Sequence, residues 1–167
     1  IATGVTIQNT HTGSGVWTAM DFQANQGTPV SGTFTGMTLN GATLSSVEGN
    51  IILAGKGGDT SNANYGISVN NSSQILATNA ATITLTGETG ATSGDSNMGV
   101  YVTNNSNIQA ENGNINVTGT TLATGNYNKG ITFDLVSTII STGSTADAAT
   151  ITLTGTSAGT NYCEGIE

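Results

Sequence analysis

Arginine is missing from this sequence of 167 residues, and lysine occurs only as Lys56 and Lys129. Ten carboxylates outnumber the two cations and give a formal net charge of −8. A surface that binds nucleic acid neutralises phosphates with clustered basic side chains, so we expect no binding to nucleic acid. The longest aliphatic run, residues 51–54, is far shorter than the roughly 20 residues of a membrane-spanning helix. We therefore expect no insertion into a membrane.

Cysteine and histidine each occur once, as Cys163 and His11. A single cysteine cannot form an internal disulfide, and no spacing typical of a zinc site surrounds it. His11 lies in the polar segment T-H-T-G-S-G without a paired nucleophile. The acidic residues fall at different positions of the repeat described below, unlike the clustered acids and cations of polysaccharide-cleaving β-helices. The sequence therefore predicts no enzyme, no catalytic residue and no resident cofactor.

Glycine is abundant, at 24 residues, while only 7% of the residues are charged. Disordered chains typically have high net charge and few β-branched residues, whereas Ile, Val and Thr recur throughout this one. The composition favours an ordered β-structure.

A repeat runs along the whole chain, because six short segments each begin with glycine and continue with alternating apolar residues. These segments begin at Gly4, Gly36, Gly66, Gly99, Gly130 and Gly165. The intervals between them are 32, 30, 33, 31 and 35 residues, and so steady a period is typical of solenoids. The sequence predicts one all-β domain over residues 1–167, a right-handed parallel β-helix with an irregular first turn over residues 4–35. We expect about five turns, each with three strands and about 32 residues.

Alternation with period two identifies the side chains that point into the solenoid. The first strand of each repeat is expected to bury Val5, Ile7, Leu39, Ile67, Val69, Val100, Val102, Ile131 and Phe133. The third strand is expected to bury Ile83, Leu85, Ile115, Val117, Ile151 and Leu153. The Gly- and Asn-rich tracts after the third strand predict loops that project from one corner.

Two segments leave alternatives open. In the first repeat, Val16, Met20 and Phe22 fit a strand with Trp17 pointing outward, but the spacing of Val16, Met20 and Ala24 also fits a short helix. The residues Asn9, Asn71 and Asn104 follow the first strand. They fit either a ladder of stacked amides or the preference of asparagine for turns.

Candidate binding residues lie on the predicted surface. The outward face of the third strand presents Thr82, Thr84 and Thr86 in one repeat and Thr150, Thr152 and Thr154 in another. Such a lattice is like the ice-binding faces of antifreeze β-helices, although strand propensity also explains exposed threonines. Trp17 is a candidate for stacking on a sugar ring. Asp59 and Asp95, in Gly-rich loops, are candidate calcium ligands.

The glycine-led strand G-[VI]-x-V-x-N, the strand N/T-I-x-[LV]-T-G and the Gly/Asn/Ser loops resemble the repeats of large bacterial surface proteins. These are the filamentous-haemagglutinin-like adhesins, exported by two-partner secretion, and the passenger regions of autotransporters. The resemblance covers nearly all of the chain. It implies export to the cell surface or the medium, a right-handed β-helix, and a role in adhesion or as a surface stalk.

We therefore expect a structural or adhesive segment of an exported bacterial protein that presents loops from a β-helical stalk. One alternative is the subunit of an extracellular fibre that stacks head to tail, because the segments I-A-T-G and G-I-E resemble strands of a longer solenoid. Further alternatives are a carbohydrate-binding or carbohydrate-cleaving β-helix and an ice-binding threonine face. The expected partners are neighbouring solenoid segments, copies of this chain, or a glycan or other receptor on a host surface.

Overall fold

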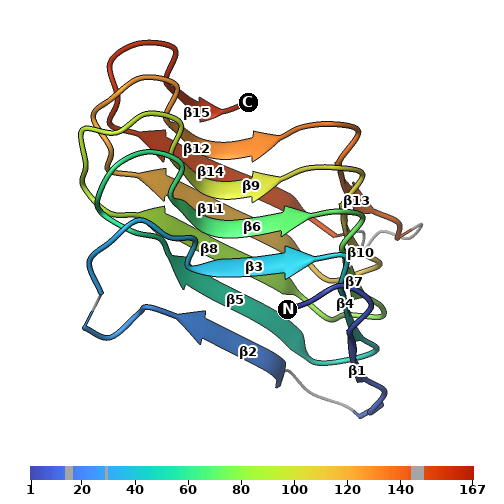
Figure 1. Ribbon diagram of the computed structural model, residues 1–167. Helices are drawn as coiled ribbons and strands as arrows, with labels where there is room; N and C mark the ends of the chain where they lie inside the picture. The colour runs from blue at the N-terminus through green and yellow to red at the C-terminus, as the bar shows by residue number, and fades with distance from the viewer. Residues whose placement is uncertain (14–16, 29, 144–148) are drawn as a thin grey trace.

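A computed structural model describes residues 1–13, 17–28, 30–143 and 149–167 of the chain. Within these ranges the protein is a parallel β-solenoid of three sheets without any helix, and Figure 1 shows the stacked turns. Each sheet has five strands, so about four full turns separate its first strand from its last. The predicted all-β parallel solenoid is confirmed.

The chain passes through the sheets in the same order in every turn, and we call them A, B and C in that order. Sheet A contains β1 (Thr6–Asn9), β4 (Thr43–Ser46), β7 (Gln74–Ala77), β10 (Asn107–Ala110) and β13 (Thr138–Ser141). Sheet B contains β2 (Thr18–Ala24), β5 (Asn50–Lys56), β8 (Ile83–Thr89), β11 (Ile115–Thr121) and β14 (Ile151–Ser157). Sheet C contains β3 (Met37–Asn40), β6 (Tyr65–Asn70), β9 (Met98–Val102), β12 (Lys129–Phe133) and β15 (Glu164–Ile166).

The core consists of columns of aliphatic side chains, because equivalent residues of successive turns lie side by side. In sheet B one column contains Ile51, Ile83, Ile115 and Ile151 in register. Fully buried members of the predicted core are Leu39, Ile67, Val69, Ile83, Leu85, Val100, Val102, Ile115, Val117 and Ile131. Each such side chain contributes roughly 1.5–3 kcal/mol to folding, so the columns stabilise the solenoid without any helix.

Two of the predicted core residues are exposed instead. Val5 is 40% exposed and Ile151 is 38% exposed. Both belong to the outermost described turns, where a neighbouring turn covers an inward side chain on one side only. Ile7, Phe133 and Leu153 also lie near the ends of the stack, and they are partly buried against the core.

The first turn differs from the expected alignment. The segment at Gly4 does not join the sheet of the other glycine-led strands, because β1 pairs with β4 in sheet A, with Ile7 beside Leu44. Ile1 occupies the position beside sheet C, since the N–H of Asn40 donates to its carbonyl at 3.0 Å. The second strand of this turn is β2, so the helical alternative is wrong, while Val16 and Pro29 lie outside the described residues.

Of the two alternatives for Asn9, Asn71 and Asn104, the ladder of stacked amides is wrong. Asn9 ends a strand of sheet A, and its amide donates to the carbonyl of Glu48 at 2.6 Å. Asn71 and Asn104 are exposed turn residues with φ of 58° and 54°. Asparagine tolerates this left-handed conformation better than most residues, so the turn preference explains both positions.

Sheets B and C approach each other most closely at two facing columns of glycine. One column contains Gly55, Gly87, Gly119 and Gly155, and the other contains Gly36, Gly66, Gly99, Gly130 and Gly165. A Cβ atom added to Gly87 would lie 2.1 Å from the carbonyl oxygen of Gly99, and one added to Gly99 would lie 2.3 Å from the backbone nitrogen of Thr120. These contacts involve backbone atoms, which cannot move aside as a flexible side chain can. We call this narrow part of the cross-section the glycine waist.

We predict that Gly99→Ala lowers the free energy of unfolding by about 3 kcal/mol, because the added methyl group forces the two sheets apart. Urea unfolding followed by circular dichroism measures the change. The matched control is Gly27→Ala, since a Cβ atom at Gly27 meets nothing within 4 Å. Equal stability of the two variants would show that the waist tolerates a side chain.

Candidate functional site

The loops between sheets B and C stack on one edge of the solenoid, as Figure 1 shows at the left of the view. From the second turn onward they are residues 57–64, 90–97, 122–128 and 158–163, and we call them together the loop corner. The sequence predicts their place but describes them as projecting loops. Instead they pack on one another, because Asn64, Asn97, Ala123 and Asn128 are each fully buried within the corner.

A ladder of asparagine side chains forms the centre of the loop corner. The Oδ1 atom of Asn97 accepts from the backbone N–H of Asn64 at 2.8 Å and from its side-chain amide at 3.0 Å. Asn128 repeats both contacts with Asn97, at 2.8 and 3.1 Å. In the last described turn Cys163 takes the equivalent place, and its Sγ accepts from the N–H of Asn128 at 3.3 Å. The ladder therefore joins each loop to the next one through buried side chains.

The asparagine ladder holds the loops as well as joining them. The amide of Asn64 donates to the carbonyls of Thr60 and Ser61, and the amide of Asn128 donates to those of Gly94 and Ala123. Sequence reasoning missed this ladder. Its signal is an asparagine two residues before the glycine of a sheet C strand, in N-Y-G, N-M-G and N-K-G.

A second, outer column of polar residues runs beside the ladder. It contains Asn62, Asp95, Asn126 and Asn161. Asn62 Oδ1 accepts from the N–H of Asp95 at 2.8 Å, and Asp95 Oδ1 accepts from the N–H of Asn126 at 2.7 Å. The carboxylate of Asp95 thus has the same linking role as the amides around it.

The other candidate calcium ligand, Asp59, links the loop corner to the first turn. Its Oδ1 accepts from the hydroxyl of Ser31 at 2.7 Å and from the N–H of Gly32 at 2.9 Å. The hydrogen bond from Ser31, followed by that from Gly32, lowers the pKa of Asp59 below its ordinary value of 3.8. Asp59 and Asp95 therefore lie at different places in the stack, each bonded to a neighbouring turn. Among the described residues, no three His, Cys, Asp or Glu side chains are grouped as a metal site would require.

Between the two polar columns lies a column of residues with left-handed backbone. Ala63, Ser96, Tyr127 and Tyr162 have φ of 56°, 57°, 55° and 51°. The rings of Tyr127 and Tyr162 stack with centroids 5.1 Å apart and planes 5° from parallel. Both remain open to solvent, with exposed fractions of 51% and 73%. Sequence reasoning gave these tyrosines no role, although each lies three residues before a glycine of the repeat, Gly130 or Gly165.

The outward face of sheet B brings most of the predicted threonines together. Thr84 and Thr152 flank Asn116 in one column, and Thr86 and Thr154 flank Thr118 in the next. Thr120 and Thr156 extend this face by a third column that the sequence did not identify. Thr82 and Thr150 precede their strands, where Asn50 and Asn114 of neighbouring turns accept from their N–H groups. Ile52 and Ala54 continue the first two columns in β5, so the polar lattice covers three turns.

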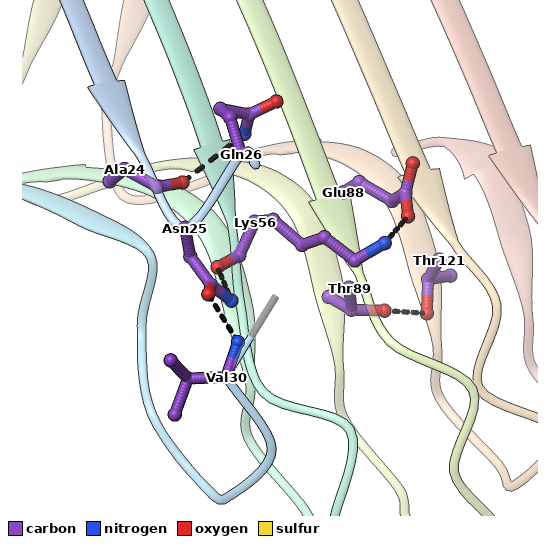
Figure 2. A network of polar contacts seen from close by, with 8 residues as sticks. All are labelled: Ala24, Asn25, Gln26, Val30, Lys56, Glu88, Thr89 and Thr121. Atoms are coloured by element: carbon purple, nitrogen blue, oxygen red, sulfur yellow. Dashed lines mark hydrogen bonds and ion pairs between the residues drawn. The ribbon is translucent and has the colours of Figure 1, made fainter. Parts of the chain in front are cut away.

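Both lysines are paired with a carboxylate of the next turn. Lys56 Nζ lies 2.6 Å from Glu88 Oε1 on the outward face of sheet B, and Lys129 pairs with Glu167. Figure 2 shows the first pair beside the amide of Asn25, which donates to the carbonyl of Lys56 at 3.2 Å. The same view shows the buried hydroxyls of Thr89 and Thr121 joined at 2.9 Å. These contacts link neighbouring turns.

Trp17 is half-buried, whereas an aromatic ring that stacks on a sugar needs an open face. Its indole lies over Gly49, where an added Cβ atom would be 2.9 Å from the ring. The His11 ring meets the indole edge-on, with centroids 5.2 Å apart. Trp17 therefore contributes packing in the first turn.

Comparisons with protein-family models, with curated proteins and with solved structures found no match. In the part of the chain that the structure describes, no helix has the length and hydropathy needed to cross a membrane.

We predict that Asn97→Ala lowers the free energy of unfolding by about 2–3 kcal/mol, because it leaves buried donors of Asn64 without their acceptor. Urea unfolding measures the loss. Asn116→Ala is the matched control, since this asparagine lies on the outward face of sheet B and forms no side-chain hydrogen bond within the described residues. An equal loss of unfolding free energy in Asn116→Ala would show that the ladder stabilises the protein no more than an asparagine on the surface of sheet B does.

We predict that Asp59→Ala lowers the melting temperature near neutral pH and that this difference from the wild type disappears in acid. A carboxyl group whose pKa is depressed by folding stabilises the protein above its unfolded pKa, and this contribution is lost as the pH falls through the folded pKa. The window therefore lies below the ordinary value of 3.8. Thermal melts across this range measure the difference, and a constant difference at all pH values would contradict the proposed linkage.

Proposed function

We propose that this chain is a structural and adhesive segment of an exported bacterial surface protein, a stalk that presents the loop corner. The observation that carries the proposal is the asparagine ladder of Asn64, Asn97 and Asn128, which joins loops of successive turns. Free loops lose conformational entropy when they bind a partner, whereas loops held in advance lose less. A stack of fixed loops is thus suited to recognition at a surface.

The build of the solenoid also suits a stalk. Each turn adds about 4.8 Å of height, the spacing of neighbouring strands, and stability in such an array comes from contacts between adjacent turns. Here those contacts include aliphatic columns, the glycine waist and a column of serines. Ser73 accepts from the N–H of Ala42, and Ser106 accepts from the N–H of Ser73 at 3.2 Å. Polar and apolar contacts therefore both resist sliding of one turn over another.

The charge of the surface limits the partners that this proposal allows. The net charge is −8, and each of the two lysines is paired with a glutamate. Such a surface repels anionic polymers at long range. The proposal therefore requires an uncharged or cationic partner.

We predict that the protein is accessible on the outside of intact cells that produce it. An antibody raised against the folded chain should label these cells, and an extracellular protease should remove the label while a cytoplasmic marker remains. Antigen found only after cell lysis would overturn the proposal. Purified chain of known folded state serves as the control for antibody specificity.

A further inference from the structure

We propose that the loop corner contains a binding site for a neutral glycan, in which a sugar ring lies against the free face of Tyr127. This inference rests on the proposed function and names a partner for it. The site is formed by the left-handed column of Ala63, Ser96, Tyr127 and Tyr162, defined above, together with the outer polar column beside it.

The first argument is the shape of the left-handed column. Its members are equivalent, because the N–H of Ala63 donates to Asp95, that of Ser96 to Asn126 and that of Tyr127 to Asn161, each at 3.0–3.1 Å. Two small side chains are thus followed, turn by turn, by two large rings. Tyr162 stacks on one face of Tyr127, and the small residue Ser96 is the neighbour of Tyr127 in the column on the side away from Tyr162. The column changes from small to large side chains between Ser96 and Tyr127, and each half of it spans about two turns, or roughly 10 Å. We call this place the tyrosine ledge.

The second argument is the exposure of the rings together with their backbone. A non-glycine residue in the left-handed region is strained, and such strain is found preferentially at functional sites. Tyr127 is 51% exposed although Tyr162 covers one of its faces. The Tyr127 ring is therefore not part of the hydrophobic core. A flat, open aromatic face is suited to the apolar C–H face of a pyranose ring.

The third argument is the polar surroundings of the tyrosine ledge. Asn62, Asp95 and Asn126 lie in the neighbouring column on the same turns as Ala63, Ser96 and Tyr127. One carboxylate oxygen of Asp95 accepts from the N–H of Asn126, which fixes the carboxylate at the edge of the ledge. Amide and carboxylate groups beside an aromatic ring are the partners that sugar hydroxyls require.

The charge of the chain indicates which glycans fit. Asp95 belongs to the outer column of the ledge, and the whole chain has a net charge of −8 with its two lysines paired elsewhere. Uronates and sulfated sugars would therefore be repelled. The proposal is limited to neutral hexose and N-acetylhexosamine chains.

Saturation-transfer NMR and titration of the full chain with cellotetraose, chitotetraose and lactose test the site. We expect at least one of these probes to bind, with a Kd on the order of 1 mM for a single aromatic contact. Tyr127→Ala should weaken binding about tenfold or more. Ser96→Leu should abolish binding while the fold is kept, because a larger side chain without an aromatic face then covers Tyr127 on the side away from Tyr162. The control Leu122→Ala removes a side chain of the same loop that is 41% exposed, and it should bind as the wild type does.

Three results would overturn the glycan site. They are absence of binding by all three probes, wild-type binding by Ser96→Leu, and a preference for polygalacturonate over the neutral probes. If the tyrosine pair only stabilises the stack, Tyr127→Ala would lower the melting temperature and no sugar would give saturation transfer with the wild type. Surface accessibility is measured separately on cells. Labelled cells without sugar binding would overturn the glycan site alone, and sugar binding without labelled cells would overturn the surface role alone.

Discussion

The close approach of sheets B and C at the glycine waist is the constraint on which the rest of the structure depends. A Cβ atom at Gly119 would lie 2.1 Å from the carbonyl oxygen of Gly130, so a side chain here cannot coexist with the present backbone. From β5 onward, the waist divides the interior of each turn into two parts. On one side the sheets diverge around large aliphatic columns that sheet A closes, and on the other side the loop corner begins. The glycines that mark the sequence repeat, with the exception of Gly4, are therefore positions of contact between two sheets.

Different interactions stabilise the two parts of the interior. The aliphatic side depends on the removal of apolar surface from water, which is not directional and which permits substitutions of similar size. The loop corner is too narrow for large side chains and contains irregular backbone, so its buried N–H and C=O groups need partners. Asn64, Asn97 and Asn128 supply both a donor and an acceptor at each turn. Directional bonds of this kind fix the loops in one arrangement, which hydrophobic packing alone would leave variable.

The sequence predicts the solenoid and most of its core because period two and the glycine interval are local patterns. It fails where the answer depends on alignment between turns. The segment after Gly4 alternates like a sheet C strand, yet its apolar residues fit equally beside Leu44 and Ile75 of sheet A, and only pairing distinguishes these choices. Val5 and Ile151 alternate correctly but are covered on one side only. The asparagine ladder and the tyrosine pair do lie at constant offsets before the repeat glycine. They were missed because the tracts that contain them have no apolar period, and only the packing between turns shows that these side chains meet.

In a solenoid, inward columns must keep similar side chains from turn to turn, whereas outward columns can vary. Inward columns repeat similar residues because each turn contacts the next, so a change of size there is felt by both neighbours. An outward column has no such requirement, and its departures from the pattern are informative. At the corner between sheets C and A, the left-handed positions of Asn71 and Asn104 are followed by Leu135, which is 57% exposed at φ of 49°. At the loop corner, the departure consists of two aromatic rings stacked on each other. Leu135 adds strain without forming a shaped surface, whereas Tyr127 and Tyr162 add strain and form a face bordered by fixed amides, so recognition is best sought at the loop corner.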